Sequence, residues 1–541
     1  MGRARRLVRC VALSPPRVRV RHACGPLSPL RLGIPDATLA VISSLAATTP
    51  AVAEISTIDL GKLCASNVYH RKAIRYGDAW LEADFLGAPV ETVREDIARA
   101  HIALVTANMT QNAGAAALVI HELKRLHPQV VVLVGGTDAT FRPDFYLSHD
   151  ADVVVRGEAE TLLPRLLTSL ADGGDFSSLP NLAWRTRQGG TQCSPMMDSS
   201  ARGVWLPQPD KWVLPLLNEV TIGSRLHEGR PPEGVSSRSV YLETSRGCRP
   251  GDCGFCTTPY RTGGGSGYRR MPIDHLAQLL DAISDRNVTT VQVSDDNLLA
   301  RCDEKGGEDE LFGSLSLMRQ RGLAWEFANG LQLSRLISAG RPREDLLRAL
   351  FSPQVGEDGR LVGGYRLFLP LETLPVNTSE RYRRWSKMRG LDEAAVLGIL
   401  EGLDRAGIRM VSLGVMIGFP DDTPKHIDAV VDGMGTISAA IRRMNRARRA
   451  NGVPEMDVHW DVTIYMLLPG TPDYAAYKHR LLFQDGYDSH PELVNFHTAA
   501  YHPLYMSAWD LTKIRHEIAR DFGSVEVPQE DGSTYHQFAA V

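Results

Sequence analysis

The sequence has few cysteines, no long apolar run and little net charge. Eight cysteines in 541 residues are too few for a disulfide scaffold. No apolar run reaches the roughly 18 residues that a membrane span needs. The start MGRARRLVR leads only into CVAL and then SPP, a pattern that does not fit a secretory signal. We therefore expect a cytoplasmic protein without a membrane span.

The remaining composition is that of an ordinary globular protein. Hydrophobic residues make up 43% of the chain and charged residues 23%. The net charge of -3 gives no general attraction to nucleic acid, so no nucleic-acid partner is expected. A chain of 541 residues is too long for one hydrophobic core and indicates two or three domains.

Three of the cysteines are grouped in the segment TSRGCRPGDCGFCTTPY: Cys248, Cys253 and Cys256. Thiolates are the usual protein ligands of iron-sulfur clusters, and a four-iron cluster held at three corners leaves one iron free for an exogenous ligand. The alternatives are a zinc site completed by a later residue such as His275, and a chance grouping. The other five are expected to be inert thiols: Cys10, Cys24, Cys64, Cys193 and Cys302.

The first third of the chain alternates between short apolar runs and amphipathic segments. Strands are predicted within 6–16, 54–60, 100–110, 129–139 and the start of 151–170, and helices within 37–49, 115–128 and the end of 151–170. Such alternation is typical of an open, doubly wound parallel sheet with helices on both faces.

Small and polar residues follow three of these predicted strands. Ligands of open parallel sheets bind beyond the carboxyl ends of the strands, where glycine turns let the backbone come close. The residues at these ends are Thr106, Gly135, Gly136, Thr137, Gly157 and Glu158. Glycines after strands are also ordinary turn formers, and the absence of a GxGxxG fingerprint disfavours a dinucleotide.

Strand and helix units return after residue 239 and predict a partial (β/α) barrel. Strands are expected within 289–300, 325–330, 365–372, 409–420 and 458–472, and helices within 275–286, 346–351 and 393–407. The segment 181–238 is rich in proline and polar residues and is predicted to be a connection, with room for a small hairpin. Catalytic groups are expected where the barrel strands end.

The cysteine segment resembles the radical S-adenosylmethionine (SAM) superfamily, whose motif is CxxxCxxC with an aromatic residue before the last cysteine. Phe255 occupies that aromatic position. The chain departs from the motif because four residues separate Cys248 from Cys253, and we interpret Pro250-Gly251 as a turn that loops out the extra residue. The resemblance implies a 4Fe-4S cluster whose open iron binds SAM.

The first third is similar to the cobalamin-binding domain that precedes the barrel in one radical SAM class. The similar segments are LRLGIPDATLAVISSL, VVVLVGGTDATFRPDFYL and ADVVVRGEAETLLPRLL. The resemblance implies that the strand-end residues from Thr106 to Glu158 present cobalamin over the barrel. No DxHxxG segment supplies a histidine ligand, and a vestigial domain without cobalamin is the alternative.

The same resemblance implies further contacts with SAM. They are assigned to Phe255, Asp295, Glu372, Ile417 and Gly418. The competing structural roles are a helix cap or turn for Asp295, a buried carboxylate for Glu372 and a plain strand-to-turn transition at Gly418. Arg269 and Arg270 could bind anionic groups, although salt-bridged arginines are commoner.

The predicted organisation has four parts: a cobalamin-binding-like domain at 1–180, a linker at 181–238, a radical SAM barrel at 239–478 and a C-terminal helical region with a tail at 479–541. The predicted function is C- or P-methylation in specialised metabolism, with a small-molecule or peptide substrate and a reducing electron donor. The alternatives are a radical SAM cyclase or rearrangement enzyme, and a non-enzymatic iron-sulfur or zinc protein that senses a ligand.

Overall fold

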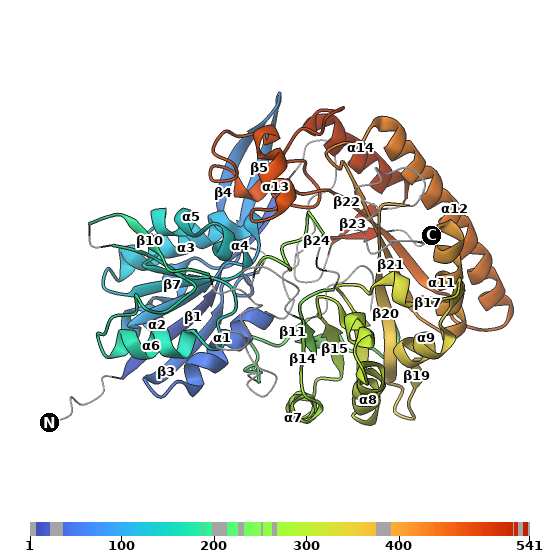
Figure 1. Cartoon of the computed structure of the whole chain (residues 1–541), viewed down its shortest axis with the longest axis horizontal. Coiled ribbons are helices and arrows are strands. Elements are labelled where there is room, and N and C mark those ends of the chain that lie inside the picture. Colours follow the sequence, from blue (N-terminus) through green and yellow to red (C-terminus); the bar gives the residue numbers. More distant parts are fainter. Residues whose placement is uncertain are drawn as a thin grey trace.

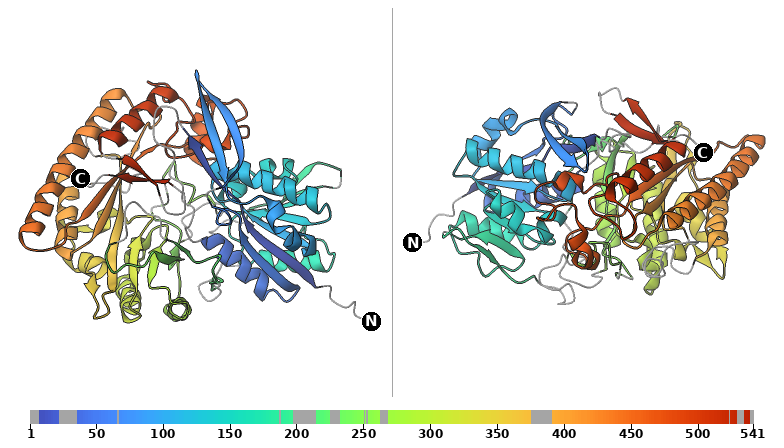
Figure 2. Two further views of the ribbon diagram at one scale, coloured as in Figure 1. Left: turned by 180° about the vertical axis from the view of Figure 1, so that it is seen from behind. Right: turned by 90° about the horizontal axis from the view of Figure 1, so that it is seen from above.

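The computed structural model of the chain contains two α/β units side by side (Figure 1). It describes residues 7–21, 36–65, 67–186, 188–196, 214–224, 232–249, 251, 253–261, 268–374, 391–522, 524–528 and 534–538. The first unit, blue to teal, is built on a seven-stranded sheet, and the second, green to red, on an eight-stranded one. Views from behind and from above show the same two-part arrangement (Figure 2).

The first sheet has the order β10-β9-β8-β7-β6-β1-β3. Its strands are β1 (Val8–Ser14), β3 (Val52–Asp59), β6 (Ile102–Thr106), β7 (Val131–Gly135), β8 (Val153–Val155), β9 (Leu182–Arg185) and β10 (Thr191–Cys193). The five strands from β3 to β8 are parallel, and the β9–β10 hairpin adds two antiparallel strands. This hairpin, which lies in the segment predicted to be a linker, therefore completes the first sheet.

Helices cover both faces of this sheet, as the alternating pattern predicts. They are α1 (Ala37–Thr48), α2 (Arg94–Arg99), α3 (Ala113–Leu126), α4 (Thr137–Phe141), α5 (Pro143–Ser148) and α6 (Leu163–Ala171). One core packs α2, α3 and α5 on the sheet, and a second core packs α1 and α6 on the other face. Because both faces are buried, the strands are continuous apolar runs in the sequence.

The second sheet is an open barrel with the order β11-β12-β15-β16-β20-β21-β22. Its strands are β11 (Gly223–Ser224), β12 (Arg238–Leu242), β15 (Thr290–Val293), β16 (Ala324–Phe327), β20 (Leu361–Glu372), β21 (Met410–Ile417) and β22 (Asp457–Ile464), with β19 (Gln354–Val355) paired to β20. The six strands from β12 to β22 are parallel. In the described residues β12 and β22 do not pair, so the barrel stays partial.

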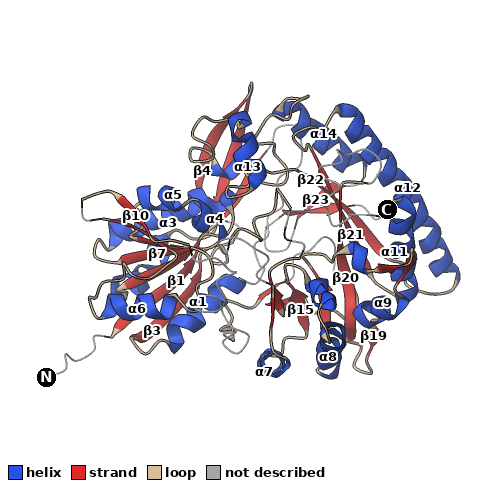
Figure 3. Ribbon diagram, viewed as in Figure 1, coloured by secondary structure: helices blue, strands red, loops and turns tan. Residues whose placement is uncertain are grey.

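Helices line the outer side of this sheet (Figure 3). They are α7 (Ile273–Ser284), α8 (Gly307–Gln320), α9 (Glu344–Phe351), α11 (Glu393–Ala406) and α12 (Pro424–Ala450). Strand residues such as Val291 and Leu413 pack into the core beneath them. Other positions of the same strands carry polar residues. Arg366 lies 3.4 Å from Glu326 and 2.9 Å from the Ser412 hydroxyl, and all three residues are buried.

A small antiparallel sheet joins the first domain to the C-terminal region. It contains β2 (Arg17–Arg21), β5 (Ala79–Leu86) and β4 (Val68–Tyr76). The C-terminal region contains α13 (Pro472–Tyr477), α14 (Ala508–Asp521), β23 (Ser524–Pro528) and β24 (Thr534–Phe538). The Tyr76 hydroxyl lies 2.8 Å from the Ala499 carbonyl and 2.8 Å from the Thr512 hydroxyl. This contact fixes the β4–β5 hairpin against α14.

The predicted fold class is confirmed: a doubly wound sheet is followed by a partial barrel and a C-terminal helical region. The predicted domain boundaries stay predictions, although β9 and β10 extend the first sheet past residue 180. None of the described helices is long and apolar enough to cross a membrane.

We predict that Tyr76→Phe destabilises the contact between the hairpin and α14. Loss of the buried hydroxyl removes its hydrogen bonds to the Ala499 carbonyl and the Thr512 hydroxyl, and a buried polar group that loses its partner costs about 1–3 kcal/mol. Hydrogen exchange should speed up in peptides from α14 and from β4. Tyr505→Phe is the control, because Tyr505 is 63% exposed and should leave exchange unchanged. Unaltered exchange in Tyr76→Phe would contradict this role.

Candidate functional site

The three grouped cysteines lie in a loop that a short two-stranded stem closes. The stem pairs β13 (Ser245–Arg246) with β14 (Arg269–Arg270), and the cysteine loop is residues 247–268 between them. The loop begins just after β12, at the carboxyl end of the first parallel barrel strand, which is where ligands of such sheets bind. Cys248, Cys253 and Cys256 are half-buried and form no disulfide.

The extra residue between the first two cysteines is placed in a turn-forming conformation. Gly251 has a φ of +69°, in the left-handed region that a residue with a side chain rarely adopts. Pro250 and Asp252 lie outside the described residues. After Cys253 the loop turns back, because the Cys256 amide donates to the Cys253 carbonyl at 3.2 Å.

Two aspartates after β15 hold the start of the cysteine loop. The Asp295 carboxylate accepts hydrogen bonds from the Thr244 amide at 2.7 Å and from the Ser245 hydroxyl at 2.5 Å. Asp296 accepts from the Gly247 amide at 2.8 Å. These contacts are with a distant segment, so Asp295 has a structural role that is neither a helix cap nor a local turn, and its contact with SAM stays a prediction.

Asn297, the next residue, reaches the first cysteine itself. Its amide nitrogen lies 3.6 Å from the Cys248 sulfur, 2.7 Å from the Arg249 carbonyl and 3.0 Å from the Gln332 side-chain oxygen. Its own carbonyl oxygen is buried and makes no hydrogen bond with any residue that the structure describes. A hydrogen bond to a cysteine sulfur tunes the potential of a bound cluster, and a free buried acceptor suits a ligand with an amino group.

The donor set of the loop fits an iron-sulfur cluster better than a single metal ion. No group of three His, Cys, Asp or Glu side chains among the described residues could hold one ion, and His275 in the first turn of α7 adds none. In a cluster each thiolate binds a different iron, so the sulfurs stand farther apart. Three half-buried thiols that share one loop fit that arrangement and leave one iron open.

The cysteine loop also docks on the last barrel strand. The Phe255 ring packs edge-on against Tyr465, with the ring centroids 5.8 Å apart. The Tyr465 hydroxyl donates to Asp473 at 2.5 Å, and the Asp473 amide donates to the Gly254 carbonyl at 3.0 Å. The first and last parallel strands are thereby bridged by the loop, and contact of Phe255 with SAM stays a prediction.

Glu372 ends β20 in a strained backbone conformation. Its φ is +50°, which is uncommon for a residue with a side chain, and a register shift between Pro370 and Glu372 precedes it. The side chain is 9% exposed. Such strain is found where a strand end must present a particular side chain, so the geometry agrees with a binding role that stays a prediction.

Ile417 and Gly418 end β21 in tight protein packing. Gly418 has a φ of +79°, and a Cβ there would lie 2.2 Å from the Leu511 side chain of α14. The close approach that this glycine permits is therefore to Leu511, and contact of either residue with an adenine ring stays a prediction. Asp422 accepts from the amides of Gly418 and Phe419 at 2.9 and 3.0 Å.

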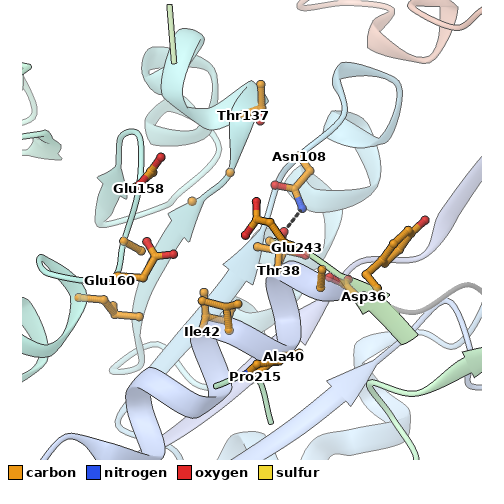
Figure 4. Close-up of a pocket in the computed structure, with 18 of the residues that line it drawn as sticks. Asp36, Thr38, Ala40, Ile42, Asn108, Thr137, Glu158, Glu160, Pro215 and Glu243 are labelled. Atoms are coloured by element: carbon orange, nitrogen blue, oxygen red, sulfur yellow. Dashed lines mark hydrogen bonds between the residues drawn. The ribbon is translucent and has the colours of Figure 1, made fainter. Parts of the chain in front are cut away.

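The strand-end residues of the first domain gather around one cavity of about 260 Å³. Thr106, Gly135, Gly136, Thr137, Gly157 and Glu158 all line it. Figure 4 shows α1 on one side, with Asp36, Thr38, Ala40 and Ile42 turned toward the strand ends. Barrel residues complete the wall, among them Tyr241 and Glu243. The cavity therefore lies between the domains.

The cavity fits part of a large cofactor with apolar rings and polar arms. Apolar residues from the middle of the strands, such as Leu104 of β6 and Leu133 of β7, line it, and the Asn108 amide beside them donates to the Thr38 hydroxyl at 2.9 Å. At Gly136 a Cβ would lie 2.5 Å from the Ala107 carbonyl, so only glycine fits. No histidine is among the described residues that line the cavity.

Charged residues meet where this cavity borders the cysteine loop. Glu158 accepts from Arg269 at 2.5 and 2.9 Å. Burial raises the pKa of Glu158, but the hydrogen bond from Arg269 and the nearby charge of Arg246 outweigh it and hold the pKa at about 2. Burial raises the pKa of Glu243 to about 7 although Arg246 donates to it at 2.7 Å. The predicted binding residue Glu158 therefore already has partners across the domain interface.

Sequence reasoning missed the roles of Glu160, Glu243 and Arg246. Arg246 pairs with both glutamates, and Glu160 comes from the turn after β8 (Figure 4). No local pattern marks Glu160 as a partner of Arg246, because the two are 86 residues apart, whereas Glu243 is a near neighbour of Arg246 in the chain. Arg269 and Arg270 are both salt-bridged, which is the commoner of the two roles considered for them. Arg269 pairs with Glu158, and Arg270 pairs with Glu304 and Glu310.

Comparisons with known proteins identify the first domain. Residues 56–167 match the family model of the B12 binding domain. No curated protein sequence matches the chain. The match covers β6, β7 and β8 with the turns that line the cavity.

Solved structures match the whole chain in fold. The chain is similar to the radical S-adenosylmethionine methyltransferase TsrM from Kitasatospora setae, solved with cobalamin and a [4Fe-4S] cluster: identity is 15%, the match covers 98% of this chain and 87% of that one, and the TM-score is 0.57. It is also similar to OxsB, a cobalamin-dependent S-adenosylmethionine radical enzyme solved with aqua-cobalamin and S-adenosylmethionine, at 12% identity over 99% of this chain and 65% of that one, with a TM-score of 0.54. At these identities the two likenesses show the fold of the chain.

We predict that Asp422 makes folding stability fall as the pH rises. Burial raises its pKa in the folded state to about 7, whereas an unfolded aspartate has a pKa of about 3.9. Between these values the folded state binds the extra proton, so the free energy of unfolding declines from pH ~4 to ~7. Asp422→Asn should flatten this part of the decline.

Urea unfolding at several pH values measures the effect as the difference between Asp422→Asn and the unaltered protein. Asp428→Asn is the control, because Asp428 lies close to Asp422 in the chain, in the first turns of α12, and is exposed. A pH profile of Asp422→Asn that parallels the unaltered one would show that Asp422 is ionised in the folded state.

Proposed function

Because the chain has the fold of the cobalamin-dependent radical SAM enzymes and contains a B12 binding domain, we propose that it is a radical SAM enzyme that uses a 4Fe-4S cluster and cobalamin to methylate an unactivated carbon or phosphorus centre. One observation carries the proposal. The three-cysteine loop lies at the end of the first barrel strand and borders the cavity built from the glycine turns of the B12 binding domain. Under this proposal, two cofactor sites of different chemistry would lie next to each other in one chain.

Cys248, Cys253 and Cys256 would hold the cluster, which supplies the electron for cleavage of SAM and an open iron for its amino and carboxylate groups. The aspartates after β15 fix the loop backbone, and Asn297 offers a free carbonyl oxygen beside Cys248. Phe255 and Tyr465 shield the loop with aromatic rings. In this proposal, these residues would position the cluster and SAM and limit the access of water to them.

Thr106, Gly135, Gly136, Thr137 and Gly157 would hold cobalamin, which supplies a methyl carrier. The cavity they line opens to the barrel wall at Tyr241 and Glu243. A substrate would bind between the domains, where both cofactors can reach it. Methyl transfer is proposed ahead of cyclisation or rearrangement because TsrM, with a similar domain order over the whole chain, is a methyltransferase.

We predict that Cys248→Ala, Cys253→Ala and Cys256→Ala each abolish cluster assembly and reductive cleavage of SAM. The three thiols share one cluster, so loss of any ligand should remove it. Cobalamin retained after anaerobic purification should stay close to that of the unaltered protein, because its predicted site is in the first domain. Iron content, absorbance and deoxyadenosine release measure these effects.

Cys302→Ala is the matched control, since Cys302 is half-buried and lies outside the cysteine loop. It should keep both the cluster and cobalamin. A chain that binds neither cofactor after anaerobic reconstitution would contradict the proposed function and favour a ligand-sensing protein.

Methyl transfer is tested with SAM that carries a labelled methyl group. With reductant and an accepted substrate, the product should gain the label, and without substrate the label should appear on protein-bound cobalamin. Cleavage of SAM with a product that gains no methyl group would favour a cyclase or rearrangement enzyme.

A further inference from the structure

The stem of the cysteine loop places two positive charges directly opposite each other. Arg246 on β13 pairs with Arg269 on β14 in the antiparallel register. Like charges at such opposed positions destabilise an antiparallel pair. The stem has two residues on each side, and the Met271 amide extends it by donating to the Thr244 carbonyl at 2.9 Å.

One carboxylate from the other domain bridges both arginines. Glu158 accepts from Arg269 at 2.5 and 2.9 Å and from Arg246 at 3.5 Å. The side chains of Glu158, Arg246 and Arg269 are only 9%, 13% and 13% exposed. A bidentate, largely buried arginine–carboxylate pair is much stronger than a surface ion pair.

The backbone brings the same turn of the first domain close to the far side of the loop. Gly157 has a φ of +77°, and a Cβ there would lie 3.0 Å from the carbonyl oxygen of Arg261. Arg261 follows the last cysteine and pairs with Asp296, which also binds the Gly247 amide. The turn at 157–160 therefore contacts the cysteine loop at its stem and beyond its third cysteine.

We propose that Glu158 is a positioning residue that closes the stem of the cysteine loop from the neighbouring domain. Docking of the B12 binding domain then sets the place of the three cysteines, and Glu160 adds a second carboxylate on Arg246. This role replaces the direct contact with cobalamin that the sequence predicted for Glu158. This inference rests on the proposed function in one respect, namely that the three cysteines hold a cluster.

The first test needs no cofactor. In the full-length apo chain, Glu158→Gln should speed up amide hydrogen exchange in peptides covering 245–261 on the order of tenfold, because the amide keeps the size but not the charge that holds the two arginines together. Asp488→Asn is the matched control: it removes the carboxylate of an ion pair between the first domain and the C-terminal region, with Arg142 at 2.8 Å, away from the stem. It should leave this exchange unchanged.

A double-mutant cycle separates the bridge from a general loss of stability. Arg269→Gln removes the bond to Glu158 and also the repulsion from Arg246, so Glu158→Gln should add little exchange in that background. If Glu158→Gln alone does not fold, the double variant should fold again for the same reason. Additive effects of the two substitutions, or exchange at the stem that Glu158→Gln does not alter, would overturn the proposal.

The loaded chain gives a second readout. In Glu158→Gln the spectrum of the reduced cluster should broaden or shift, while the cobalamin content should equal that of Asp488→Asn. Loss of cobalamin with an unchanged cluster spectrum and unchanged exchange would return Glu158 to the cobalamin site. Because the exchange test uses the apo chain, absence of both cofactors would reject the proposed function without deciding the role of Glu158.

Discussion

The contact between Glu158 and the arginines of the cysteine-loop stem sets how the two halves of this protein face each other. Each half is a parallel sheet whose strand ends carry its polar and small residues, so each has one edge suited to a ligand. Glu158 lies at that edge in the first half, and Arg246 and Arg269 lie at that edge in the second. Their pairing turns the two edges toward one cavity.

Burying charged side chains costs free energy, which explains why this interface contains more than one arginine–glutamate pair. A largely buried carboxylate is stable only with partners for its charge, and removing one partner leaves an uncompensated charge. Arg246 is shared by Glu158, Glu160 and Glu243, and burial raises the pKa of Glu243 to about 7. The interface thus holds its charges in a network in which the pKa of Glu243 is raised and the pKa of Glu158 is lowered.

The sequence was sufficient to predict the parallel strands and the residues at their ends. Buried parallel strands are apolar runs, and turns after them contain glycine, so Thr106, Gly135 and Gly157 could be placed at one cavity. The cysteine loop was also predicted, since its three thiols are close in the chain. These features depend on local patterns.

Features that depend on distant partners could not be predicted. The strands of the β2-β5-β4 sheet contain many charged residues, and Tyr76 finds its partners more than 420 residues away. Asp295 follows a strand, as ligand-binding residues of such sheets do. Its carboxylate nevertheless accepts hydrogen bonds from Thr244 and Ser245, just before the cysteine loop. Glu158 also follows a strand, which predicts a ligand contact, and its arginine partner Arg269 belongs to another domain with no periodicity that links the two.

The central claim is that one chain holds a cluster and cobalamin at facing sites. Electron paramagnetic resonance of the anaerobic protein, loaded with both cofactors in paramagnetic states, tests it most directly. Two spins that face each other across one cavity should interact, so the spectrum should show splitting or broadening that neither cofactor gives alone. A spectrum equal to the sum of the two isolated signals, at full occupancy of both sites, would contradict the account.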